Sequence, residues 1–478
     1  MTNSALKKAY NPDTFREQGH QLINQLSNHL DKSLKGKSKT TIQWKTPEGE
    51  RQFWLDFLES GDVEDLFSNI TQRSIHIHNL KYIGHQVAPA LPLTALSNTL
   101  AGLLSNGSAV YEMGKVSSVM EHIIAKIICK AIGYSKNSGG FLTSGGTLAT
   151  LTALLTARQI MVPDDVWQNG NKKQLGIMVS EQAHYCVDRA ARIMGLGEQG
   201  VIKIPVTENF NMDTAQLEDQ YQKAKAKGIH IFAIVGSAPS TATGSYDSLD
   251  TIGEFSRSKN IWFHVDGAHG GAAIFSEKYK YLLKGIDTAD SVIIDGHKMM
   301  MLPNITTALL YKNTEHSHAT FSQKADYLLQ QSEDEDWYNM AKRTFECTKN
   351  MMSIHWYAVI KTYGISIFDD YVTSLYDLGH EFAKRIKISP NFELALEPQT
   401  NIVCFRFCSE NLNLNEQNVL NRNIREQLLE DGEFYIVETA LKGVHYLRTT
   451  IMNPFTTIDH LNDLLKVIKL KAHSINAA

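Results

Sequence analysis

The sequence has few cysteines, and none of the five forms a Cys-x-x-Cys pair. An odd number without such spacing argues against a complete disulfide framework and favours a reducing compartment. Long apolar runs are also missing, since none approaches the roughly 18–20 residues that a membrane-spanning helix needs. The first residues, MTNSALKKAYNPDTF, lack the apolar core of a signal peptide. We therefore expect a soluble, cytoplasmic protein.

The sequence has no excess of basic charge either. Lysine and arginine number 47 against 51 aspartates and glutamates, giving a net charge of −4, which argues against binding to nucleic acid or to an anionic membrane. The GxxxxGK[ST] pattern is absent, so a P-loop nucleotide site is not expected. The pairs His76/His78 and His316/His318 have no carboxylate or cysteine to complete a ligand set. We therefore predict no metal site.

The middle of the chain alternates between apolar strands and helices. From residue 174 onward, strands such as QLGIMVS, IHIFAIVGS and IWFHV are separated by segments with helical periodicity. Continuous apolar strands joined by helices are typical of a mostly parallel sheet that is covered by helices. The sequence therefore predicts an α/β fold.

The two ends of the chain have a different character. Asn11 and Pro12 indicate the start of an N-terminal helix, and a second helix is expected in GERQFWLDFLESG. Whether these helices pack on their own chain or on a second subunit is left open by the pattern. Residues 71–115 read as irregular because Pro89 and Pro92 interrupt them. A long helix is expected through ECTKNMMSIHWYAVIKTYG.

After about residue 375 the pattern predicts a small α+β domain with an antiparallel sheet. We therefore expect an N-terminal helical segment at 1–95, a large α/β domain at 96–372 and a small C-terminal domain at 373–478.

An acid and a lysine follow two of the predicted parallel strands. Asp266 ends the apolar run IWFHV, and Lys298 follows SVII and the short bend DGH. Open α/β sheets hold their ligands at the carboxyl ends of such strands. A lysine that forms an imine and an acid that pairs with a pyridine nitrogen are what a pyridoxal phosphate enzyme requires. An acid and a lysine at the same edge of the sheet thus favour a pyridoxal phosphate site.

A glycine-rich turn precedes the helical stretch TLATLTALLTARQI. Gly145, Gly146 and Thr147 would form its first turn, where backbone N–H groups and the helix dipole favour an anion such as phosphate. The alternative is a loop that only reverses the chain. A lone histidine such as His184 is more often a capping or core residue, but its position right after a strand end strengthens the case that it faces the crevice.

A polar segment, QKADYLLQQSEDEDWYNMAKRT, interrupts the pattern. It contains the acidic run 333–336 and Tyr338. Either it is a solvated loop, or it is a mobile lid that carries Tyr338 over the site.

With these pieces placed, the chain resembles the group II pyridoxal-phosphate-dependent amino-acid decarboxylases. That family includes glutamate, aromatic amino acid, cysteine sulfinate and 2,4-diaminobutyrate decarboxylases. The most specific marks are HVDGAHGG and DGHKMMM. Supporting marks are TSGGTLATLTALLTAR, SEQAHYCVDRAARIMG, VGSAPSTATGSYD, WYNMAKRTFECTK and HYLRTTIMNP. The resemblance implies a fold type I enzyme, similar to aspartate aminotransferase.

The resemblance also implies roles for the catalytic residues. Lys298 would form the internal Schiff base, and Asp266 would keep the pyridine nitrogen protonated, so that loss of CO₂ leaves a quinonoid. His184 would stack on the ring. Tyr338 matches the family's proton donor on a mobile loop, with Asp334 as an alternative.

Further positions match the family's cofactor and substrate contacts. Phosphate would be held by Gly145, Gly146, Thr147 and His297. Ser240 and Thr241 would approach the ring or its 3′ oxygen. Arg448 would bind a substrate carboxylate, with His85 and Gln86 in the same pocket. A homodimer is also implied, with the active site at the interface and the N-terminal helices exchanged between subunits.

Three departures from the family pattern bear on the substrate. Asn79-Leu80-Lys81 replaces His-Pro-Arg or His-Pro-Lys, Pro239 stands where glycine is usual, and Gly267 and His269 replace alanine and tyrosine. Aromatic decarboxylases tend to have aromatic residues near His85 and Gln86, and tryptophan in place of Met299. We therefore expect an acidic or polar aliphatic amino acid, of the glutamate, aspartate, cysteine sulfinate or 2,4-diaminobutyrate type.

Other functions remain as alternatives. An aromatic amino-acid decarboxylase, an aminotransferase or a decarboxylating deaminase would keep the fold and the cofactor. A catalytically silent binding protein would belong to another class, but the retained Lys298, Asp266 and His184 argue against it.

Overall fold

A computed structural model describes residues 4–321 and 336–477 of the chain. Its contacts divide the chain into two compact units. The smaller unit comprises residues 1–85, 384–395 and 404–478, and the larger comprises 86–383 and 396–403. The sequence-based division at 1–95, 96–372 and 373–478 stays a prediction, since compactness does not decide which parts fold independently.

The larger unit is built on a seven-stranded sheet with the order β1-β7-β6-β5-β4-β2-β3. Strands β2 to β6 pair in parallel, whereas β7 runs antiparallel to both β1 and β6. The strands are β1 Gly139–Thr143, β2 Leu175–Ser180, β3 Val201–Ile204, β4 His230–Ser237, β5 Trp262–Asp266, β6 Ser291–Asp295 and β7 Thr307–Tyr311. This is the mostly parallel sheet that the sequence predicted.

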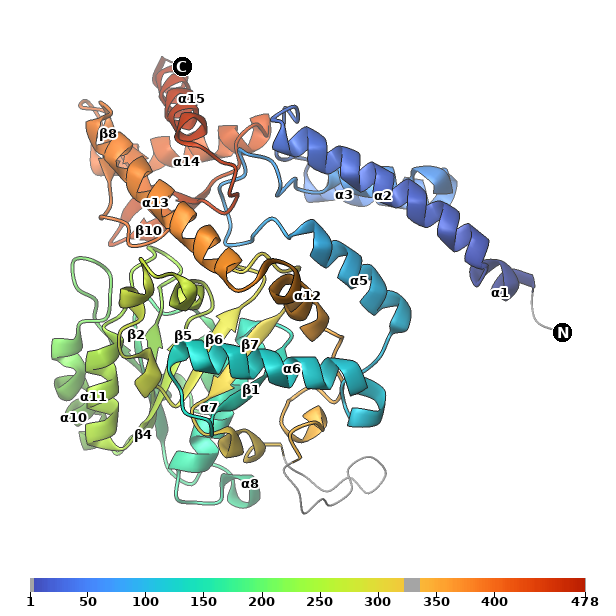
Figure 1. Ribbon diagram of the computed structural model, residues 1–478. Helices are drawn as coiled ribbons and strands as arrows, with labels where there is room; N and C mark the ends of the chain where they lie inside the picture. Colours follow the sequence, from blue (N-terminus) through green and yellow to red (C-terminus); the bar gives the residue numbers. More distant parts are fainter. Residues whose placement is uncertain (1–3, 322–335, 478) are drawn as a thin grey trace. The chain divides into compact units, whose positions relative to one another are not determined.

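Helices surround this sheet (Figure 1). Helix α7 packs against β4, β5, β6 and β7, and α11 packs against β4 and β5. A large apolar core, which includes Phe141, Leu154 and Phe232, joins α7 and α9 to the strands. The helices of this unit are α5 Pro92–Leu104, α6 Tyr111–Ile132, α7 Gly146–Met161, α8 Val166–Asn169, α9 Cys186–Ile193, α10 Leu217–Ala226, α11 Leu249–Lys259 and α12 Ser353–Tyr363.

The smaller unit contains the antiparallel sheet β10-β11-β9-β8. Its strands are β8 Phe392–Leu394, β9 Ile402–Phe407, β10 Val437–Leu441 and β11 Val444–Thr450. Its helices are α1 Ser4–Ala9, α2 Pro12–Leu34, α3 Pro47–Ser60, α4 Leu66–Arg73, α14 Leu414–Asp431 and α15 Ile458–Ala477. Helix α13, Ser366–Ile388, begins in the larger unit and ends in the smaller one. The predicted start of α2 is confirmed, because the Asn11 side chain accepts from the N–H groups of Asp13 and Thr14.

Two local predictions are wrong. Pro92 does not interrupt a segment but begins α5, because proline at the first helical position forfeits only an N–H that has no helical partner. Helix α12 begins at Ser353 rather than near Glu346. The residues before Ser353 make other contacts. The Lys349 carbonyl accepts a hydrogen bond from the Ser108 N–H, and the Lys349 side chain donates to Glu121 on α6.

In residues 4–321 and 336–477, none of the helices combines the length and apolar character that crossing a bilayer requires.

Candidate active site

The carboxyl ends of β2, β4, β5 and β6 meet at a cavity of about 190 Å³ in the larger unit. The parallel order of these strands brings together side chains that are more than 100 positions apart in the sequence. The predicted residues that line this cavity are Gly146, Thr147, His184, Thr241, Asp266, His297 and Lys298. The structure therefore unites the acid, the lysine and the glycine-rich turn.

Lys298 faces a second acid that sequence reasoning did not single out. Its Nζ lies 3.2 Å from Oδ2 of Asp295, the last residue of β6. Asp295 is buried, and its Oδ1 accepts a 2.5 Å hydrogen bond from the Thr307 hydroxyl. His297 Nε2 lies 3.6 Å from the same carboxylate. Lys298 thus rests beside a fixed counter-charge.

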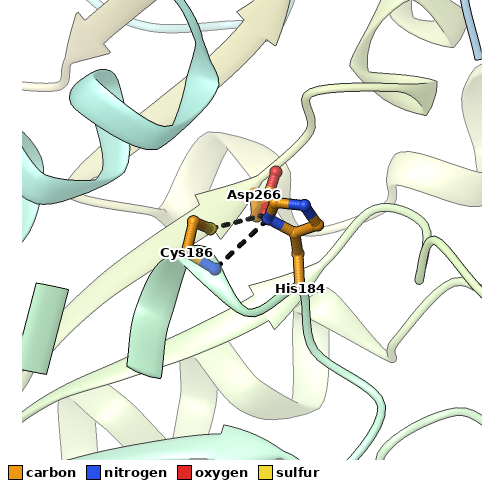
Figure 2. A group of neighbouring side chains, drawn as sticks. All are labelled: His184, Cys186 and Asp266. Atoms are coloured by element: carbon orange, nitrogen blue, oxygen red, sulfur yellow. Dashed lines mark hydrogen bonds between the residues drawn. The ribbon is translucent and has the colours of Figure 1, made fainter. Parts of the chain in front are cut away.

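Asp266 and His184 lie next to each other, together with Cys186 (Figure 2). Asp266 Oδ1 accepts from Ala268 N–H at 3.1 Å, and its Oδ2 lies 3.8 Å from the Cys186 sulfur. The Cys186 N–H donates to His184 Nδ1 at 3.3 Å, so the neutral imidazole carries its proton on Nε2. Burial, opposed by the charge of Asp266, lowers the pKa of His184 and favours this neutral ring.

The start of α7 forms an anion cradle. Gly145 has φ +110°, a backbone conformation that L side chains rarely adopt, and a Cβ on Gly146 would lie 3.1 Å from Asp295 Oδ1. No side chain of the described residues caps this helix end. Its first N–H groups therefore remain available for an anion, which the helix dipole also favours.

His184, Cys186 and Asp266 also form a group whose ligand atoms lie within 4.8 Å of one another, as metal ligands would. The chemistry of the thiol argues against a metal. Burial and the charge of Asp266 raise the pKa of Cys186, whereas a metal ligand must be a thiolate. The cation at Lys298 and the anion cradle instead fit a ligand that carries a carbonyl, a ring nitrogen and a phosphate.

Four predicted residues of the larger unit lie outside the cavity lining, namely Gln86, Gly145, Ser240 and Tyr338. The Ser240 hydroxyl pairs with that of Thr243 at 2.8 Å, within its own loop. Tyr338 packs edge to face on Tyr111 and Trp337. Asp334 and most of the acidic run, 333–335, lie outside the described residues.

Arg448 lies in the smaller unit, on β11. It is 7% exposed, and its Nε and Nη2 find no hydrogen-bond partner among the residues that the structure describes. Burial lowers the pKa of Arg448. The pKa of His85 is also lowered, first by its own burial and then by the positive charges of Arg448 and Arg425. Gln86, in the larger unit, is 9% exposed, and its Nε2 is likewise unpartnered within the described chain.

A comparison with known families accounts for this geometry. The model described as pyridoxal-dependent decarboxylase conserved domain matches residues 65–408, well over half of the chain. The chain belongs to this family. Its members are pyridoxal phosphate-dependent amino-acid decarboxylases, which are carboxy-lyases of class EC 4.1.1.

Individual relatives cover most of the chain. An L-2,4-diaminobutyrate decarboxylase of Acinetobacter baumannii is 27% identical over 430 residues, covering 87% of this chain and 83% of the relative. An aspartate 1-decarboxylase of Aliivibrio fischeri is 28% identical over 454 residues, covering 85% and 82%. The crystal structure of mouse CSAD has a TM-score of 0.87 at 23% identity and covers 96% of this chain and 99% of its own, which establishes the shared fold. That fold is the predicted fold type I architecture.

Two ionisable residues of the cavity lining were not singled out from the sequence. Asp295 stands three positions before Lys298 in DGHK, and Cys186 stands two after His184 in AHYC. Both positions could have been predicted from the sequence, because residues next to a strand end lie at the same edge of the sheet as the strand end itself. What the sequence did not indicate is which partner each one meets.

Proposed function

We propose that this decarboxylase converts an L-amino acid with an acidic or polar aliphatic side chain to its amine and CO₂. Lys298 holds the cofactor through its ε-amine, which must first leave the ion pair with Asp295. Asp266 would hold a proton at the pyridine nitrogen, and the neutral imidazole of His184 would contact the ring. The bound cofactor supplies an electron sink for the pair of electrons that departing CO₂ leaves behind.

Further residues in and near the cavity would hold the phosphate and the ring edge. Gly145, Gly146 and Thr147 present N–H groups at the start of α7, and His297 adds a ring nitrogen beside Asp295. Thr241, together with Ser240 in the same loop, is assigned to the ring or its 3′ oxygen. Tyr338 is assigned as the proton donor to Cα after CO₂ departs.

Two nitrogens of the Arg448 guanidinium, Nε and Nη2, have no partner among the described residues, which supports the binding of a substrate carboxylate there. A buried cation whose donors have no acceptor is costly unless an anion binds there. The neighbouring charge of Arg425 and the neutral His85 add no negative charge that would compete. The relatives include an L-2,4-diaminobutyrate decarboxylase, but several others are aspartate or acidic amino acid decarboxylases, and these favour an acidic substrate. We therefore favour the glutamate, aspartate or cysteine sulfinate type over 2,4-diaminobutyrate.

We also propose that the chain acts as a homodimer. Leu96, Leu100 and Leu103 on α5 are 53%, 52% and 67% exposed, and Met113 and Val116 on α6 are more than half exposed. Such a run of large apolar side chains is unusual on a monomer surface, and it is what a subunit interface would cover. The N-terminal helices are assigned to the same interface.

A panel of L-amino acids, scored for both CO₂ and amine, tests the proposal. We expect equimolar CO₂ and amine from an acidic amino acid. Arg448→Met should lower kcat/KM for that substrate at least about 30-fold, because truncating one partner of a buried charge pair costs 2 kcal/mol or more. Arg406→Met is the matched control, because this arginine of the neighbouring strand β9 also has two nitrogens without a partner among the described residues, but its Nη2 donates to the Glu393 carboxylate at 2.7 Å, which balances its charge.

Formation of a keto acid without release of CO₂ would contradict decarboxylation and would indicate an aminotransferase reaction instead. Preference for an aromatic substrate, or equal activity of Arg448→Met and Arg406→Met, would overturn the assignment of an acidic substrate.

A further inference from the structure

Cys186 contacts both groups that are assigned to the cofactor ring. Its backbone N–H donates to His184 Nδ1, and its side chain reaches Oδ2 of Asp266 (Figure 2). The residue begins α9 and is 2% exposed. The sulfur also lies 3.7 Å from the Thr150 hydroxyl on α7. One residue therefore connects two cofactor-facing groups to two helices of the scaffold.

The direction of the Cys186–Asp266 contact follows from chemistry. A carboxylate only accepts hydrogen bonds, so the sulfur must be the donor. Burial and the negative charge of Asp266 both raise the pKa of Cys186, which keeps its proton in place. The Thr150 hydroxyl oxygen, 3.7 Å from the sulfur, is a second acceptor for the one thiol proton. The negative charge of Asp266 makes Oδ2 the stronger acceptor of the two.

This contact completes the support of the carboxylate. Asp266 Oδ1 is held by Ala268 N–H, and the thiol is the donor that the structure gives to Oδ2. A thiol is a weak donor, so it can orient Oδ2 while leaving most of the negative charge for a protonated ring nitrogen. Orientation matters here because a catalytic group must be held within about 0.5 Å of its productive position. Supporting contacts of this kind hold it there.

We propose that Cys186 is a positioning residue, whose thiol orients Asp266 and whose backbone N–H fixes the ring of His184. It does not itself react with substrate or cofactor. The inference rests on the proposed roles of Asp266 and His184, and it adds that the thiol is the side chain that aligns the acid.

Three variants of the holoenzyme and its cofactor-free form test the proposal. Cys186→Ala removes the donor, Cys186→Ser keeps one, and Cys129→Ala removes another buried thiol of the same unit, on α6. The readouts are the dissociation constant of pyridoxal phosphate from the cofactor-free protein and the visible circular dichroism of the bound cofactor. The dichroism arises from fixed, asymmetric surroundings, and a general loss of stability does not mimic it.

We expect Cys186→Ala to raise the dissociation constant about three- to tenfold, the range for losing one hydrogen bond of ordinary strength. Its visible dichroism should fall as well, whereas Cys186→Ser and Cys129→Ala should stay near wild type. Wild-type values in Cys186→Ala, or equal losses in Cys186→Ala and Cys129→Ala, would overturn the proposal. So would a Cys186→Ser variant that behaves like the alanine variant.

Asp266→Asn separates this proposal from the one on which it rests. If Asp266→Asn changes cofactor binding and Cys186→Ala does not, the role of Cys186 is refuted and the site stands. If neither changes it, the assignment of Asp266 to the cofactor fails first.

Discussion

Replacing Lys349 with methionine is expected to lower the free energy of unfolding of the larger unit strongly, because the substitution breaks a buried ion pair. Lys349 Nζ lies 2.5 Å from Glu121 Oε1, and the two side chains are 0% and 1% exposed. Lys349 also donates to the Leu142 carbonyl at 2.7 Å, and Glu121 accepts from the Leu142 N–H at 2.8 Å. The pair thereby satisfies both backbone groups of Leu142 on β1, an edge strand of the sheet.

The magnitude follows from what the variant leaves behind. Lys349→Met strands the Glu121 charge in the core, and removing one partner of a buried pair costs about 3–5 kcal/mol. That is a large part of the 5–15 kcal/mol that stabilises a typical protein. Adding Glu121→Gln removes the stranded charge and keeps a side-chain oxygen that can accept from the Leu142 N–H, so the double variant should recover part of the loss. The Leu142 carbonyl stays unpaired, which leaves a deficit of about 1–3 kcal/mol.

Urea unfolding followed by tryptophan fluorescence measures these differences as shifts of the midpoint. Lys280→Met is the control, because its pair with Glu277 is 50% and 81% exposed and should contribute under about 1 kcal/mol. β1 leads into the anion cradle, so Lys349→Met should also weaken cofactor binding. A loss below about 1 kcal/mol, or a double variant no more stable than the single one, would refute the reasoning.

Three further predictions concern chemistry, pH and assembly. Tyr338→Phe should raise the ratio of aldehyde or keto acid to amine more than it raises KM, and an unchanged ratio would place the proton donor elsewhere. Burial lowers the pKa of His264 from 6.5 to about 4. As pH falls below 6.5, the imidazole is therefore protonated in the unfolded chain but not in the folded one, and the free energy of unfolding decreases. About 2 kcal/mol should be lost between about pH 7.5 and 5. His264→Asn should flatten this slope in urea unfolding while the exposed His20→Asn keeps it, and parallel slopes would contradict the prediction. Leu103→Glu on α5 should reduce the sedimenting mass to that of one chain, whereas Leu470→Glu, equally exposed on α15, should not; a dimer that survives Leu103→Glu would exclude this surface.

Much of the sheet was predictable because several of its strands have a characteristic sequence pattern. Ile261–Asp266 and Ser291–Asp295 are continuous apolar runs that end in a polar residue, which is the pattern of a buried parallel strand. Strand β7 was missed, although TALLY is equally apolar. It follows Lys298 after a short turn, and no helix intervenes to mark it as a new unit, since it returns antiparallel to β6.

The acid, the lysine and the glycine turn could be placed at one site because the edge rule for parallel strands is general. The neighbours Asp295 and Cys186 could not be given partners from the sequence. Their contacts depend on side-chain directions and on where α7 and α9 begin, which periodicity fixes only to within a few residues. Arg448 could be located on its strand, but nothing in HYLRTT indicates that two of its nitrogens lack partners.

Borohydride reduction of the purified holoenzyme tests the central claim most directly. Reduction converts the imine to a stable amine, so peptide mass spectrometry identifies the lysine that carries the cofactor. We predict that the visible absorption disappears and that the cofactor mass remains on the peptide containing Lys298. Lys298→Ala should keep its fold and carry no label. Labelling of another lysine, or of none, would contradict the assignment of this cavity as the cofactor site.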